Sequence, residues 1–126
     1  MTPTEAREAL GAVIEAAGLR VASPSGSIGQ IPCVVIVGSE PWIVPVQLGS
    51  RRTQLNLEAV ALVGGTSDAI AMETLEAMAV KLSRAIHGAK DWTLPIVHRH
   101  GRSEAQGQTY QSVRVSTSIV IADTTS

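Results

Sequence analysis

Two histidines in one short segment are the residues best suited to chemistry in this chain. His98 and His100 are separated by one residue, so an extended segment would place both imidazoles on the same side. His87 could supply a third ligand, and three histidines can bind zinc. The surrounding sequence offers no carboxylate pattern to support such a site. We therefore expect neither a bound metal nor another cofactor.

The residues that most enzymes use as nucleophiles or phosphate binders give no stronger signal. Cys33 is the only cysteine, which excludes an internal disulfide, and its apolar surroundings indicate a buried side chain. The Gly64-Gly65 turn lacks the spacing and the lysine of a Walker motif. The carboxylates are dispersed, and no Gly-x-Ser-x-Gly elbow occurs. We therefore expect no catalytic residues, and the protein is not expected to be an enzyme.

Arginine and tryptophan indicate a different use, which is contact with another macromolecule. Arginine forms bidentate pairs with carboxylates, and both residue types are enriched at interface hot spots. Two arginines lie in the polar segment 98–107, two more lie in an expected loop over 47–53, and Trp42 comes shortly before that loop. The candidate residues for a subunit or partner interface are Trp42, Arg51, Arg52, His98, Arg99, His100 and Arg102.

Two amphipathic helices are expected to support these segments. Thr2 can cap the first helix, with Pro3 in its first turn and Glu5 completing a capping box, and Gly18 can end it. Its apolar stripe consists of Leu10, Val13, Ile14 and Ala17. The second helix is expected over about 68–87, with acidic residues early and basic residues late. Its stripe consists of Ile70, Leu75, Met78, Leu82 and Ile86.

The remaining segments have strand patterns. Apolar residues on both faces of 31–37 predict a central strand, whereas Pro41 and Pro45 permit only an edge segment over 38–45. Residues 54–63 alternate between apolar and polar side chains. At the C-terminal end, we expect a hairpin in which a ten-residue polar loop, 98–107, joins the segment 93–97 to a long alternating strand over 109–121.

The order of these elements predicts an α+β fold in a single domain over residues 1–126. Two helices would cover one face of a mostly antiparallel sheet of about four to five strands, with one long β-hairpin carrying an extended polar loop. The formal net charge of −1 argues against a dedicated nucleic-acid binder. The apolar runs are much shorter than the ~20 residues of a membrane span. The first residues lack the pattern of a signal peptide, which predicts a cytosolic product.

A resemblance rests on the order and lengths of five parts. They are the capped helix ending at Gly18-Leu19, the strand 31–37 leading to Pro41-Trp42, the strand 54–63, the helix after Gly64-Gly65 and the last strand after Tyr110. In this combination the chain resembles the tail terminator and tail-completion proteins of long-tailed bacteriophages. That family has no diagnostic catalytic or binding motif, so no functional residue is transferred from it.

The resemblance implies a structural virion protein. Such proteins form a ring, usually hexameric, at the head-proximal end of the tail tube, where they end tube polymerisation and join the tail to the head-completion or neck proteins. The implied partners are other copies of the chain, the tail tube protein and a head-completion protein. DNA would pass through the lumen without specific binding, and no membrane is involved. The implied location is the virion tail, after assembly in the host cytoplasm.

Other interpretations stay open at this point. A neck or head-completion connector would also bridge two rings. A small non-viral binding module would instead dock an acidic partner through its basic hairpin. An enzyme or metal protein would depend on His87, His98 and His100. Strand order and ring number do not follow from the spacing of residues.

Overall fold

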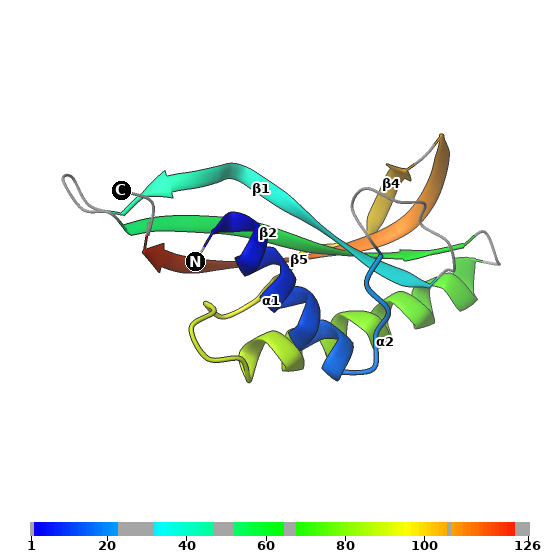
Figure 1. The fold of residues 1–126 in the computed structure, drawn as a ribbon. Coiled ribbons are helices and arrows are strands. Elements are labelled where there is room, and N and C mark those ends of the chain that lie inside the picture. The colour runs from blue at the N-terminus through cyan, green and yellow to red at the C-terminus, as the bar shows by residue number, and fades with distance from the viewer. Residues whose placement is uncertain (1, 23–31, 47–51, 65–67, 106, 123–126) are drawn as a thin grey trace.

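The protein folds as two helices packed on one face of a five-stranded antiparallel sheet, which confirms the predicted α+β class (Figure 1). The computed structural model describes residues 2–22, 32–46, 52–64, 68–105 and 107–122. The elements in chain order are α1 (Pro3–Ala16), β1 (Cys33–Pro45), β2 (Arg52–Val63), α2 (Asp68–His87), β3 (Ile96–Val97), β4 (Gly101–Ala105) and β5 (Gln108–Ala122).

Helix α1 begins with the predicted capping box. The backbone N–H of Glu5 donates to Thr2 Oγ1 at 3.1 Å, and the N–H of Thr2 donates to Glu5 Oε1 at 3.0 Å. The chain leaves the helix through Gly18, whose φ of +90° favours glycine. Leu10 and Ile14 are fully buried, so the helix is held mainly by its apolar stripe against the sheet and α2.

Helix α2 matches its predicted range, but its buried stripe begins one residue later than expected. Ala71 is buried, whereas Ile70 is 57% exposed. The buried positions are 71, 75, 78, 79, 82 and 86, which keeps one face of the helix toward the sheet. Ile70 was predicted to be buried because it is strongly hydrophobic. The later buried residues of α2 define which face meets the sheet, and Ala71 lies on that face. Within the described residues, no helix is both long and apolar enough to span a membrane.

The sheet has the order β1-β2-β5-β3, and β4 pairs with β5 on the same side as β3. Strand β1 therefore lies at one edge, so the prediction of a central strand over 31–37 is wrong. Both of its faces are apolar because the sheet has a core on each side. Val34 and Ile36 pack in the main core, while Cys33 belongs to a smaller cluster on the opposite face. The remaining members of this cluster are Ala22, Val35, Val60, Leu62 and Tyr110.

The continuation of β1 agrees with the expected edge segment. The strand reaches Pro45 after a register shift between Gly38 and Ile43, where it passes Pro41. Proline is tolerated at a sheet edge because its missing N–H faces away from the ladder. Strand β2 begins at Arg52, so residues 52 and 53 belong to a strand and not to the expected loop. The rest of that loop, 47–51, lies outside the described residues.

The expected ten-residue polar loop over 98–107 is also wrong. Residues 101–105 form β4, and Ala105 pairs with Gln108 next to the turn of the β4–β5 hairpin. Gly107 adopts a φ of +78°, as a tight hairpin turn requires. Before the turn, the segment from Trp92 to Val97 also follows β5, with partners Ile119, Ser116 and Val115. The polar residues 101–105 are therefore part of the sheet because they pair with the long strand β5.

A β-bulge separates β3 from β4. Val97 pairs with Val115 and Gly101 pairs with Ser112, so three residues (98–100) stand opposite two (113 and 114). Bulges bend a strand and increase its twist. In Figure 1, β4 and the adjoining end of β5 curve away from the sheet on the side opposite the helices. The bulge therefore coincides with the place where the hairpin leaves the plane of the sheet.

Candidate functional site

A concave pocket of about 510 Å³ lies beside this bulge, on the sheet face opposite the helices. Residues of that face alternate along β5 with the core residues Val113 and Val115. Three arginines and two histidines line the pocket, and none of the described residues that line it is acidic. These five side chains define the basic pocket: His98, Arg99, His100, Arg102 and Arg114.

The bulge explains why so many arginine and histidine side chains meet here. His98, Arg99 and His100 are its three residues, and the N–H of His98 donates to the carbonyl oxygen of Arg114 at 2.9 Å. His100 and Arg102 also line a second hollow, which they share with Met72 of α2. Because α2 packs on the other face of the sheet, these two residues lie where both faces are accessible. A regular ladder would have sent alternate side chains to opposite faces.

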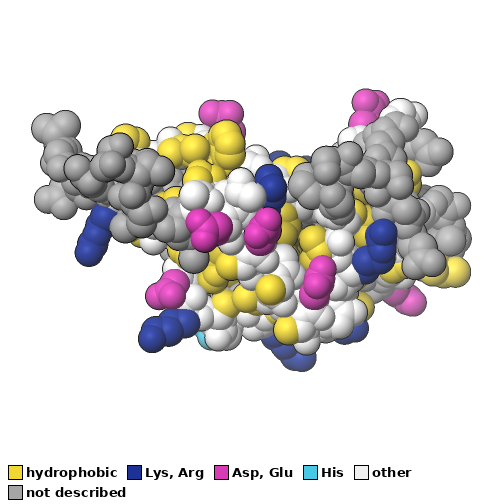
Figure 2. All heavy atoms as spheres, in the orientation of Figure 1, with side chains coloured by type: hydrophobic (Ala, Val, Ile, Leu, Met, Phe, Trp, Pro, Cys, Tyr) yellow, Lys and Arg dark blue, Asp and Glu magenta, His cyan; other side chains and the backbone are white. Residues whose placement is uncertain are grey.

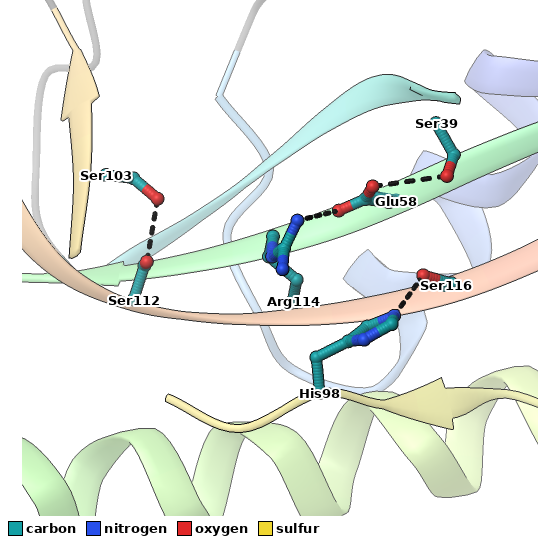
Figure 3. Close-up of polar contacts among 7 residues, drawn as sticks. All are labelled: Ser39, Glu58, His98, Ser103, Ser112, Arg114 and Ser116. Atoms are coloured by element: carbon teal, nitrogen blue, oxygen red, sulfur yellow. Dashed lines mark hydrogen bonds and ion pairs between the residues drawn. The ribbon is translucent and has the colours of Figure 1, made fainter. Parts of the chain in front are cut away.

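Two polar contacts hold the basic groups in place (Figure 3). His98 Nε2 lies 2.6 Å from Ser116 Oγ. Arg114 Nη1 lies 3.5 Å from Glu58 Oε2, and Ser39 Oγ donates to Glu58 Oε1 at 3.2 Å. Half of the Arg114 side chain stays exposed, so the ion pair contributes at most about 1 kcal/mol to stability. Its main effect is to orient the guanidinium.

A hydroxyl pair forms part of the wall between β4 and β5. The oxygens of Ser103 and Ser112 lie 2.7 Å apart, and Ser112 is buried. Both residues line the pocket, so this contact ties the bent hairpin to the sheet face beneath it (Figure 3). The pocket is thus lined by fixed polar groups with charged groups around them.

Charge is distributed differently on the side of the molecule that carries α1. There, acidic and basic side chains are interspersed, with apolar side chains between them (Figure 2). In the basic pocket, by contrast, the closest carboxylate by contact is Glu58, and it is already paired with Arg114 and Ser39. The pocket is therefore suited to attract an anion, since clustered charge of one sign in a concave site raises the local potential.

The His98–Ser116 contact also has the geometry from which a nucleophile–base pair is built. Such a pair needs a further group that orients the second ring nitrogen. In the part of the chain that the structure describes, Ser116 is the residue hydrogen-bonded to the His98 ring. Within the same ranges, His87, His98 and His100 form no group able to hold a metal ion. The contact is best explained as positioning the imidazole at the pocket wall.

The structure brings together four of the predicted interface residues: His98, Arg99, His100 and Arg102. Arg52 is at the far end of β2, since the pocket adjoins Ser112, which pairs with Leu62 near the other end of that strand. Trp42 lies on β1, half exposed, with its ring against Gly38, and it lines a small hollow together with residues at the start of α1. Arg51 lies outside the described residues.

Arg114 is the residue of the basic pocket that the sequence interpretation missed. The alternation of β5 placed it on a polar face with Ser112 and Ser116, which was the available signal. Joining that face to the histidines required the register of β3 and β4 on β5, including the bulge. Glu58 and Ser39 were missed for the same reason, because Glu58 reaches Arg114 from β2, and Ser39 reaches Glu58 from β1.

Exposed apolar side chains form two further surfaces at the edges of the sheet. The β1 edge patch consists of Val37, Trp42, Ile43 and Val46, each between 41% and 51% exposed. The β3 edge patch consists of Leu94, Ile96 and Val97, between 45% and 67% exposed. Because β1 and β3 end the strand order on opposite sides, the two patches lie on opposite edges. No protein-family model matches this chain, and no curated protein matches it.

Proposed function

We propose that this chain is a structural virion protein that forms a ring, usually hexameric in proteins of this kind, at the head-proximal end of a phage tail tube. In this role it ends tube polymerisation and joins the tail to the head-completion or neck proteins. Two lines support the proposal: the resemblance in the order and lengths of elements, and the two edge patches. The observation that carries it is the second, because exposed apolar side chains gather on opposite edges of one sheet.

Two different edges are what a ring contact needs. A ring is built by heterologous contacts, in which one surface of a subunit meets a different surface of the next. Monomeric proteins rarely leave apolar side chains clustered on the surface, and sheet edges are ready templates for pairing with another chain. The β3 edge patch of one copy is therefore proposed to meet the β1 edge patch of the next copy. Repeating that contact around an axis gives a closed ring.

Charge supports the same pairing. Glu40 is exposed in β1, next to Trp42 in the β1 edge patch, whereas Arg99 and Arg102 are exposed just beyond the β3 edge patch. Opposite charges at matching borders of two apolar surfaces favour one orientation of the contact over others. The net charge of −1 also suits a ring through which DNA passes without being held, since a strongly positive lumen would bind phosphates.

Two edge variants test the ring. The wild-type protein is expected to form a ring in mass photometry, or to assemble on the ends of tail tubes made by the tube protein of the same gene cluster. Ile96→Lys in the β3 edge patch and Val37→Lys in the β1 edge patch should each give monomers that leave tube length uncontrolled. Val80→Lys, at an exposed apolar position of α2, is the control and should assemble normally.

Mixing the two edge variants distinguishes a heterologous contact from a symmetric one. Each variant keeps the edge that the other has lost, so an equimolar mixture should form dimers with one intact contact and no larger species. If each contact joined two identical edges, the mixture would stay monomeric or form separate homodimers. A wild-type protein that is monomeric and does not alter tube length would rule out the ring.

A second candidate function is favoured by the basic pocket. A small binding module would use that concave, cationic surface to dock an acidic partner as a monomer. Light scattering separates the two candidates, because the module needs no assembly. A neck connector would also form a ring, and it would bind head-completion proteins without limiting the length of tail tubes.

A further inference from the structure

We propose that the basic pocket (His98, Arg99, His100, Arg102 and Arg114) is a binding site for a carboxylate-rich segment of a partner protein. This site lies on the face of the sheet. Its Arg99 and Arg102 lie just beyond the β3 edge patch, but binding needs only one subunit and does not depend on ring formation.

The ligand chemistry follows from the donors that the pocket presents. Each guanidinium offers a planar set of N–H groups, and this geometry matches the two oxygens of a carboxylate. Arg114 already makes such a contact within the molecule, through one nitrogen to Glu58, and half of its side chain remains exposed. Arg99 and Arg102 are exposed and are both available for incoming anions. The pocket can thus hold more than one acidic group at once.

The pocket is organised before any ligand arrives. Ser116 fixes the His98 ring, Glu58 orients Arg114, and the Ser103–Ser112 contact ties the hairpin to the sheet. Groups that are already held in place lose less conformational entropy on binding. Arginines on an open surface, without contacts that hold them in place, would lose more conformational entropy on binding. The three contacts come from four different strands or connecting segments, so the arrangement depends on the complete fold.

A protein ligand fits the distribution of charge better than a nucleic acid does. Nucleic-acid binders carry basic residues along a track that follows many phosphates. Here three arginines converge on one pocket instead of following a track, Glu104 is exposed in the adjoining strand β4, and the chain as a whole has a charge of −1. A short acidic segment needs only this one concavity. Its volume of about 510 Å³ accommodates a few side chains.

Binding of a short fluorescent poly-glutamate peptide tests the site. The probe should bind the wild-type protein, and Arg99→Glu/Arg102→Glu should weaken binding about tenfold or more, since two charge-assisted contacts are lost. Lys81→Glu/Lys90→Glu changes the net charge equally at exposed positions of α2 and the segment after it. This control should bind within about twofold of the wild type. Equal weakening by both double variants would overturn the proposal, because attraction would then be unspecific.

Four further measurements complete the test. Arg99→Gln/Arg102→Gln should also weaken binding, and circular dichroism should show that it is folded. On peptide addition, the His98 and His100 ring signals should shift in NMR spectra, and the His87 signal should not.

A single-stranded oligonucleotide or inorganic phosphate that binds more tightly than the peptide would overturn the choice of ligand. Ile96→Lys should bind the probe as the wild type does, which separates this site from the ring contact.

Discussion

His98 Nε2 lies 2.6 Å from Ser116 Oγ, and this contact joins the bulge between β3 and β4 to the middle of β5. Ile96 is the backbone partner of Ser116, so the serine meets one residue through the ladder and another through its side chain. The bulge allows Ser116 to make both contacts. It adds one residue to the strand before Gly101, and the pairing with β5 continues after it. The pocket wall is therefore fixed at the place where the hairpin begins to bend.

Ser116→Ala should loosen the His98 ring and leave the fold intact. A partly buried hydrogen bond of this kind contributes about 0.5–1.5 kcal/mol, so a small loss in the free energy of unfolding is expected in urea titrations. Affinity for the poly-glutamate probe should fall about twofold to fivefold, because His98 would no longer be held at the wall. Ser83→Ala on α2 is the control. Unchanged probe affinity would show that the position of His98 does not matter for binding.

Glu58→Gln should increase the affinity of the basic pocket for the acidic probe. The substitution keeps an oxygen that can accept from Ser39, but it removes the negative charge paired with Arg114. The free energy of unfolding should change by less than about 1 kcal/mol, since the pair is partly exposed. Fluorescence anisotropy against ionic strength measures the effect, with Glu73→Gln on α2 as the control. Weaker binding would mean that orienting Arg114 matters more than freeing its charge.

The sequence was sufficient for the parts of the fold in which local chemistry and packing agree. The capping box of α1, its end at Gly18 and the range of α2 were predicted because caps, glycine and the helix dipole act within a few residues. The alternation of β2 and β5 was equally informative, since one face of each strand packs against the helices. For α2, only the phase of the stripe was misjudged, at Ile70 against Ala71.

The errors occurred where a distant strand decides the structure. Strand β1 was expected to be central because both faces are apolar, but the second face packs in a separate cluster that includes Ala22 and Tyr110. Residues 101–105 were expected to form a loop because they are polar. They form a strand because they pair with β5. The site suffered from the same difficulty. Four of its five basic residues were recognised, and the fifth, Arg114, depended on the register.

Gly38→Ala should displace Trp42. A Cβ at position 38 would lie 2.7 Å from Trp42 Cδ1, closer than two carbon atoms can pack, so the indole must move. We expect a loss of about 1–3 kcal/mol in the free energy of unfolding. In a Trp92→Phe background, the emission of Trp42 should shift to the red as the ring becomes more exposed. Gly101→Ala is the matched control, since its Cβ would meet no atom within 4 Å. An unchanged spectrum would contradict the contact.

The capping box of α1 should make stability depend on pH in the acidic range. The hydrogen bond from the Thr2 backbone, and then that from its side chain, lowers the pKa of Glu5 below its ordinary value. A carboxyl group with a lowered pKa in the folded state stabilises the protein when it is ionised in both states. That contribution is complete above the ordinary carboxyl pKa, and it is lost as pH falls through the pKa of folded Glu5. Urea titrations at neutral and acidic pH should show the loss.

Glu5→Gln isolates this effect from the other carboxylates. Glutamine can still accept from the Thr2 N–H, so α1 should keep its cap, but residue 5 no longer titrates. The difference in the free energy of unfolding between wild type and variant should therefore be largest at neutral pH and should shrink as pH falls. Glu8→Gln is the control, because it removes the same charge from an exposed position one turn later in α1, outside the capping box. Parallel curves for wild type and Glu5→Gln would mean that the box does not order the carboxylate in solution.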